Sequence, residues 1–211
     1  MFDIDGTLVN SSKFDEACYL EAARILFGVE IPPDIDDYKH ATDSGVLDEV
    51  ITRYNISGDR NTIHRMFKNV FFNLISEHIA NNSKKIQQIK GASHFIKHLQ
   101  DLPNAKVAFA TGGWEETAKL KLKAANINID GCAFASSSDH YERTEIMKIA
   151  ESKVLTDRPF DSKTYFGDAH WDKKASETLN YRFILVGNRF EHELQIDDYQ
   201  RKQDILNILK L

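Results

Sequence analysis

The pattern of apolar and polar positions changes character along the chain. At the N-terminus, Phe2 and Ile4 alternate with Asp3 and Asp5, as in a short strand. Apolar residues then recur at three- and four-residue steps, which predicts helices through much of residues 11–87. The clearest stripe, typical of the packed face of a helix, comprises Ile63, Met66, Phe67, Val70, Phe71, Leu74 and Ile75.

From Gly91 onward, short β-type runs alternate with helix-like segments. This alternation predicts an α/β fold, a Rossmann-like parallel sheet with helices on both faces. We expect the first strand to join the same sheet, which gives a core of residues 1–10 and 88–211, interrupted by an all-helical insert at 11–87. The predicted strands are 107–110, 132–135, 164–166 and 183–186, and the predicted helices are 92–101, 115–126, 143–153, 172–179 and 200–210.

The first strand has little room, because only Met1 and Phe2 precede Asp3. Two explanations stay open at this point. Either the central strand of the sheet is short, or the natural chain starts further upstream.

Composition narrows the class of protein. The chain has 211 residues, 42% of them hydrophobic and 28% charged, as expected for one globular core with a small insert. The net charge of −5 argues against nucleic acid as the main partner. No apolar run is long enough to span a membrane, and no signal peptide precedes the first acids. We therefore expect a cytoplasmic protein, a monomer or small homo-oligomer, with no membrane partner.

Asp3 and Asp5 point to the same side of the first strand, where Gly6 permits a tight turn. The same Asp-Ile-Asp sequence recurs at 34–36, among prolines and without a strand before it, so we expect that copy to be a solvated loop. Spacing alone leaves two interpretations of the first copy: a catalytic pair, or a solvated or ion-binding strand end.

Polar residues also follow three later strands. Thr111 and Gly112 follow the first of them, a serine run and then Arg143 follow the second, and Asp168 with Asp172 follows the third. Ligands of open parallel sheets bind outside the carboxyl ends of the strands, so we expect these groups to converge on one site.

Three of these segments resemble the motifs of one enzyme family. F-D-I-D-G-T-L, A-T-G-G and F-G-D-A-H-W-D are similar to the first, second and fourth motifs of the haloacid dehalogenase superfamily. The branch with a helical cap after the first motif contains phosphoglycolate-phosphatase-like and β-phosphoglucomutase-like enzymes. The third motif is usually a lysine followed by proline; here Arg143 takes its place, with Lys148 as the alternative. The resemblance implies the strand order 5-4-1-2-3.

The resemblance also implies a reaction, the Mg²⁺-dependent hydrolysis of a small phosphorylated metabolite through an aspartyl-phosphate. Asp3 would attack phosphorus, and Asp5 would exchange protons with the leaving oxygen and the attacking water. Mg²⁺ would be held by the side chains of Asp3 and Asp168 and by the backbone carbonyl of Asp5. Asp172 would bind the water ligands of Mg²⁺ or orient the site. The phosphate oxygens would contact Thr111, Gly112 and Arg143.

This chemistry requires that the two acids differ. We expect the metal to lower the pKa of Asp3, and the surroundings of Asp5 to favour its neutral form. The resemblance also argues against carbon–halogen cleavage, because dehalogenases of the superfamily lack the second acid, which is Asp5 here. A sugar phosphomutase stays open as an alternative, as does a phosphoacceptor or binding protein on the same type of fold.

We expect the insert to form a lid over the site, with substrate contacts from residues 39–45. Trp114 either lines the pocket or packs in the core.

Overall fold

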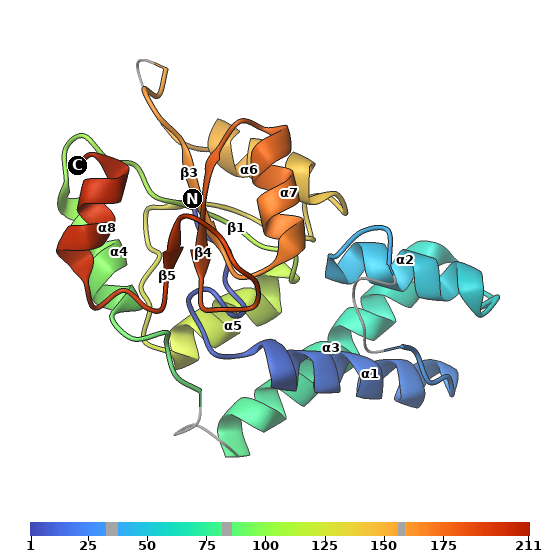
Figure 1. The fold of residues 1–211 in the computed structure, drawn as a ribbon. Helices are drawn as coiled ribbons and strands as arrows, with labels where there is room; N and C mark the ends of the chain where they lie inside the picture. The colour runs from blue at the N-terminus through green and yellow to red at the C-terminus, as the bar shows by residue number, and fades with distance from the viewer. Residues whose placement is uncertain (33–37, 82–85, 156–158) are drawn as a thin grey trace.

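The computed structural model describes residues 1–32, 38–81, 86–155 and 159–211 (Figure 1). The second Asp-Ile-Asp copy, at 34–36, lies outside these residues. The helices are α1 (Ser12–Phe27), α2 (Asp43–Arg53), α3 (Arg60–Asn81), α4 (Ala92–Asp101), α5 (Glu115–Ala124), α6 (Arg143–Ser152), α7 (His170–Thr178) and α8 (Lys202–Leu209). The strands are β1 (Ala108–Ala110), β2 (Ala133–Ala135), β3 (Thr164–Gly167), β4 (Arg182–Val186) and β5 (Gln195–Ile196).

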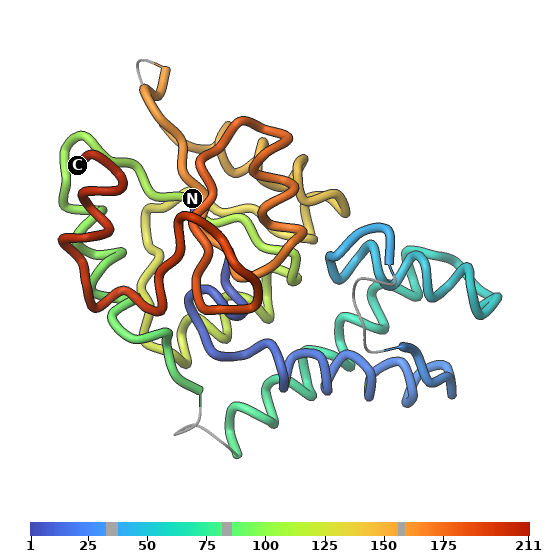
Figure 2. The backbone as a smooth tube through the Cα atoms, in the orientation of Figure 1, coloured from blue at the N-terminus to red at the C-terminus, as the bar shows by residue number. Residues whose placement is uncertain are grey.

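Among the described residues, the strand pairs with a defined ladder are all parallel: β1 with β2, β3 with β4, and β4 with β5. The N-terminal segment connects the two groups, because Phe2 forms parallel bridges with both Phe109 and Phe166. The amide of Asp3 donates to the carbonyl of Phe166 at 2.9 Å. Figure 2 accordingly shows the N-terminus in the middle of the sheet region. The predicted parallel α/β fold is confirmed, whereas the full order 5-4-1-2-3 stays a prediction, since Phe2 forms single bridges and no ladder.

Both faces of the sheet are covered by helices. Successive strand residues point to opposite faces, so Phe166 and Ile184 pack with α4, α5 and α8, while Tyr165 and Phe183 pack with α6 and α7. This two-sided burial explains why the strands are continuous apolar runs. The unpredicted strand β5 is only two residues long and has no such run.

Helices α1, α2 and α3 lie together beside the α/β part (Figure 1). They share a hydrophobic cluster of their own, which supports the predicted insert, although its limits at 11 and 87 stay a prediction. Gly28 ends α1 in the left-handed conformation. Helix α1 packs through Cys18, Tyr19, Ala22 and Ala23, which leaves Ile25 51% exposed.

Trp114 links the two parts as a packing residue. It is 1% exposed, and its ring centroid lies 5.7 to 6.0 Å from those of Tyr19, Phe67 and Phe71. Of the helices in the described ranges, none combines the length and apolarity needed to cross a bilayer.

Replacing Phe2 by alanine should strongly destabilise the fold. Phe2 is 1% exposed and its ring stacks on Phe166 with centroids 4.5 Å apart. We expect a loss of about 3–5 kcal/mol in the free energy of unfolding, measured by urea denaturation. The control Phe72→Ala, at a 37% exposed position of α3, should cost less than about 1 kcal/mol. Equal losses in the two variants would contradict a central position for Phe2.

Candidate functional site

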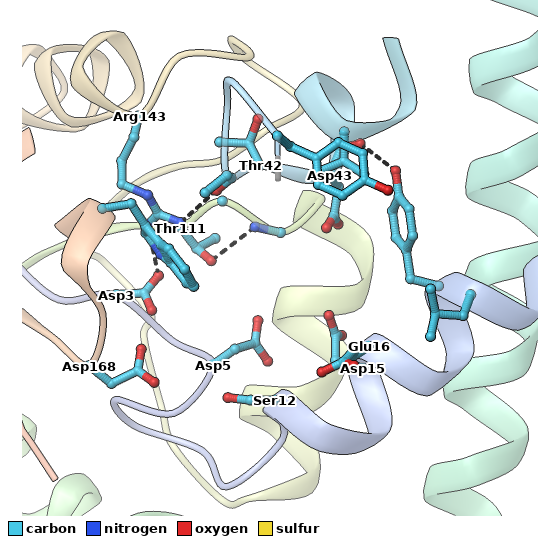
Figure 3. A pocket seen from close by; sticks show the side chains of 18 of the residues that line it. Asp3, Asp5, Ser12, Asp15, Glu16, Thr42, Asp43, Thr111, Arg143 and Asp168 are labelled. Atoms are coloured by element: carbon cyan, nitrogen blue, oxygen red, sulfur yellow. Dashed lines mark hydrogen bonds and ion pairs between the residues drawn. The ribbon is translucent and has the colours of Figure 1, made fainter. Parts of the chain in front are cut away.

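A cavity of about 410 Å³ lies where the carboxyl ends of β1 and β3 meet the N-terminal segment and helices α1 and α2 (Figure 3). The structure brings nearly all sequence-predicted site residues to it. Those that line the cavity are Asp3, Asp5, Thr111, Gly112, Arg143 and Asp168. Asp172 lies behind this wall and is fully buried.

Three carboxylates from opposite ends of the chain meet beside the cavity. Asp3, Asp168 and Asp172 each offer one oxygen, and these oxygens lie within 4.8 Å of one another. Asp3 directly follows the bridging residue Phe2, whereas Asp168 and Asp172 flank the start of α7. Carboxylate oxygens at this spacing fit a small hard cation such as Mg²⁺, which prefers oxygen ligands.

A glycine makes this approach possible. Gly6 has φ = +81°, a conformation that side chains rarely adopt, and a Cβ there would lie 2.2 Å from Oδ2 of Asp168. The turn after the first strand can therefore contact Asp168 only because residue 6 has no side chain.

Crowding makes the three acids hard to ionise. Burial, reinforced by Asp172, raises the pKa of Asp3 to about 7. Burial and the neighbouring Asp3 raise the pKa of Asp168 to about 7. Burial also raises the pKa of Asp172 to about 6, although Arg143 opposes this shift. A divalent cation would favour the ionised forms, so the donor set fits the expected metal.

Arg143 is the cation of this cluster. Its Nη1 lies 2.9 Å from Oδ1 of Asp172 and 3.3 Å from Oδ1 of Asp3, and its Nη2 donates to the carbonyl of Ala41 at 3.0 Å. Its Nε is buried and has no hydrogen-bond partner among the described residues. Lys148, the alternative, is 55% exposed and pairs with Glu145, so the geometry favours Arg143.

The second motif provides an uncharged wall. The Thr111 hydroxyl is buried and accepts a hydrogen bond from the Gly113 amide at 3.2 Å. A Cβ at Gly112 would lie 2.4 Å from Nη2 of Arg143, so glycine gives the guanidinium its space. Amides and a hydroxyl close to the start of α5 suit phosphate oxygens.

Lys121 is a site residue that the sequence did not indicate. It is fully buried on α5, with Nζ 2.6 Å from Oδ1 of Asp5 and 2.5 Å from Oδ1 of Asp15. Burial alone would lower the pKa of Lys121, but the carboxylates of Asp15 and Asp5 raise it, so the side chain is an ammonium. The hydroxyl of Ser11 also donates to Asp5. Asp5 therefore lies in an ion pair with Lys121, and the neutral form expected for it stays a prediction.

Part of the segment 39–45, the predicted source of lid contacts, lines the cavity. Ala41, Thr42 and Asp43 line it opposite the strand ends. The amide of Trp114 donates to Oδ2 of Asp43 at 2.8 Å, and the Asp43 amide donates to the Gly112 carbonyl at 2.8 Å. Burial and the nearby Asp15 raise the pKa of Asp43 well above its usual value.

A second arginine of the site, Arg189, was not predicted from the sequence. Arg189, in the loop after β4, is half-exposed and places Nη1 3.2 Å from Oδ2 of Asp168. It also lines the cavity. No motif of the sequence marks this loop position.

Comparison with known proteins assigns the family. Residues 1–186 match the family model of haloacid dehalogenase-like hydrolases. The chain belongs to this family. No curated protein sequence matches the chain.

Solved structures share the fold at low identity. A hydrolase from Pseudomonas syringae is 20% identical, with a TM-score of 0.73 over 99% of this chain and 96% of that one. A β-phosphoglucomutase from Clostridium difficile is 17% identical, with a TM-score of 0.69 over 99% and 96%. CbbY from Rhodobacter sphaeroides, in complex with phosphate, is 18% identical, with a TM-score of 0.68 over 94% and 92%.

In this haloacid dehalogenase-like hydrolase, the cavity combines four chemical functions. It has a carboxylate nucleophile candidate in Asp3, a second acid in Asp5, a fixed cation in Arg143 and a metal-compatible cluster that includes Asp168. Such a set can move a phosphoryl group to a carboxylate and then to water.

Mg²⁺ should stabilise this protein more at high pH than at low pH. Because the pKa values of Asp3, Asp168 and Asp172 are raised to about 7, 7 and 6, the metal-free protein loses stability as pH rises from about 4 to about 7. Metal binding needs the deprotonated forms, so protons compete with Mg²⁺ at low pH.

We expect the Mg²⁺-induced increase in Tm, measured by differential scanning fluorimetry, to be several-fold larger at about pH 8 than at about pH 5. Asp168→Asn should abolish most of this increase. An increase that is the same at both pH values, or that persists in Asp168→Asn, would contradict a metal site at these acids.

Proposed function

We propose that the chain is a Mg²⁺-dependent phosphomonoester hydrolase that acts on a small phosphorylated metabolite through an aspartyl-phosphate on Asp3. One observation carries this proposal: oxygens of Asp3, Asp168 and Asp172 lie within 4.8 Å of one another, beside Arg143 and next to the cavity that Asp3, Asp168 and Thr111 line. The cavity volume of about 410 Å³ suits a small metabolite.

The cluster solves an electrostatic problem of the reaction. Each unit charge of a phosphate would repel the Asp3 carboxylate by about 4 kcal/mol at about 4 Å and an effective dielectric constant near 20. Arg143, already 3.3 Å from Asp3, opposes this repulsion and has a fork that can hold two phosphate oxygens. Asp172 holds that guanidinium from behind at 2.9 Å.

The metal would be held by the side chains of Asp3 and Asp168 and the backbone carbonyl of Asp5. Bound Mg²⁺ supplies positive charge that neutralises the phosphate and stabilises charge in the transition state. Thr111 and the Gly112 amide would take the remaining phosphate oxygens.

Two displacements complete the reaction. The first displacement requires Asp5 to carry a proton when the ester binds. A carboxylate oxygen of Asp3 attacks phosphorus, the bond from phosphorus to the ester oxygen breaks, and the protonated Asp5 gives its proton to the departing alkoxide. Water then attacks the phosphorus of phospho-Asp3 while Asp5 takes its proton. Inorganic phosphate leaves, and both carboxyl groups return to their starting states.

A sugar phosphomutase is the second candidate, favoured by the shared fold of the C. difficile β-phosphoglucomutase. In that case a substrate hydroxyl replaces water in the second displacement. Release of inorganic phosphate in proportion to ester consumed distinguishes hydrolysis from isomerisation of a sugar phosphate.

The purified protein should release nitrophenol from p-nitrophenyl phosphate with Mg²⁺ and lose this activity in EDTA. Asp3→Asn should abolish steady turnover, because the amide is a poor nucleophile. Asp5→Asn should still bind substrate but turn over about 10²–10⁴-fold more slowly.

The matched control is Asp101→Asn, at an exposed residue of α4 that pairs with Lys97; it should retain full activity. Full activity in Asp3→Asn would overturn the nucleophile assignment. A single burst of phosphorylation without turnover in the wild type would instead indicate a phosphoacceptor protein.

Arg143→Gln should lower kcat/KM for p-nitrophenyl phosphate by about 10²–10³-fold, because it removes the charge that offsets repulsion at Asp3. Lys148→Gln, on the same helix and outside the cavity, should change it by less than about twofold. Steady-state kinetics at saturating Mg²⁺ tests both variants. An equal loss in the two would contradict the choice of Arg143 over Lys148.

A further inference from the structure

The cavity has two ends of different chemistry (Figure 3). Its α/β end contains the strand-end residues described above, among them Asp3, Thr111 and Arg143. Its other end is formed by the insert, whose apolar lining residues are Tyr19, Leu20, Ile31, Pro32, Tyr38 and Val46. In the proposed reaction the phosphate lies at the α/β end, so the alcohol part of the ester extends toward the insert.

Two tyrosine rings form fixed apolar walls at the insert end. Tyr19 and Tyr38 are each 8% exposed. The Tyr19 hydroxyl donates to the carbonyl of Asp43 at 2.8 Å, and the Tyr38 hydroxyl donates to the carbonyl of Pro32 at 3.2 Å. Because both hydroxyl protons are already used within the insert, the rings offer a ligand mainly their carbon surfaces.

The insert end has no positive charge among the described lining residues. The cations that line the cavity there and elsewhere in these residues are Arg143 and Arg189, and both belong to the α/β end. Arg143 lies 3.3 Å from Oδ1 of Asp3, and Arg189 lies 3.2 Å from Oδ2 of Asp168. Both guanidinium groups are therefore engaged by the acids at the strand ends.

A free carboxylate lies at the insert end instead. Glu16 on α1 lines the cavity and is exposed, and no hydrogen bond or ion pair joins its side chain to the described residues. Its neighbour Asp15, in contrast, is paired with Lys121 at 2.5 Å. A second anionic group on a substrate would meet Glu16 with no cation of the insert to offset the repulsion.

We propose that the alcohol part of the substrate is apolar and carries no negative charge, and that Glu16 favours a positive charge on it. This inference rests on the proposed function, which places the phosphate beside Asp3. It names phosphate esters of apolar, neutral or cationic alcohols as the substrate class. It excludes esters whose alcohol part carries a carboxylate or a second phosphate.

Alkylphosphonates test this inference without turnover, because they lack the ester bond that the proposed reaction breaks. Their Kd is measured by isothermal titration calorimetry with the full chain in Mg²⁺. From ethylphosphonate to butylphosphonate, each added methylene should tighten binding about two- to fourfold, as burial of apolar surface predicts. With a carboxylate in place of the terminal methyl group, butylphosphonate should bind at least about tenfold more weakly. With an ammonium there, it should bind at least as tightly as butylphosphonate itself.

Glu16→Lys should lower the preference for the ammonium over the carboxylate at least about tenfold, because repulsion replaces attraction. The matched control is Glu21→Lys, which reverses a charge on the same helix outside the cavity, at a residue paired with Arg24. It should keep the wild-type preference within about twofold.

Equal affinity for the methyl and carboxylate ends, affinities independent of chain length, or no binding by any of these phosphonates would overturn the inference. An unchanged preference in Glu16→Lys would overturn the role of Glu16. Failure of the proposed function looks different, because the wild type would then bind the phosphonates in the expected order but release no nitrophenol from p-nitrophenyl phosphate.

Discussion

The arrangement of the site depends on the mutual repulsion of three buried carboxylates. Asp3, Asp168 and Asp172 would separate if nothing opposed their charge, yet the sheet holds them within 4.8 Å of one another. Their raised pKa values express the cost of this proximity. Arg143 offsets part of it through contacts with Asp3 and Asp172. The remaining negative charge suits a divalent cation, which under the proposed function would also help to bind an anionic ester.

A second charged group closes the site on the side of the insert. Lys121 joins Asp5 to Asp15 on α1, while Asp43 at the start of α2 accepts a hydrogen bond from the Trp114 amide. Each link connects a helix of the insert to a loop or helix of the α/β part. These contacts therefore connect the position of the insert to the second acid and to the second motif.

Much of this site follows from local sequence. Apolar runs that end in acids or in Thr-Gly-Gly predict strand ends, and a parallel sheet necessarily brings those ends to one edge, which is why Asp3, Thr111 and Asp168 were predicted together. Lys121 could not be predicted in this way, because it lies between Lys119 and Lys123 on α5 and no motif distinguishes it from them. Its burial results from the packing of α1 against the site, a tertiary effect. Arg189 could not be predicted either, because its position in a loop carries no periodic signal.

The most direct measurement is anomalous diffraction from a crystal soaked in Mn²⁺, which takes the oxygen ligands of Mg²⁺ and scatters anomalously. The central claim is that acids from the two ends of the chain share one cation. It predicts a single strong peak bonded to carboxylate oxygens of both Asp3 and Asp168, next to Thr111 in the cavity. A peak bonded to only one of these acids, or a peak elsewhere with this cluster empty, would contradict it.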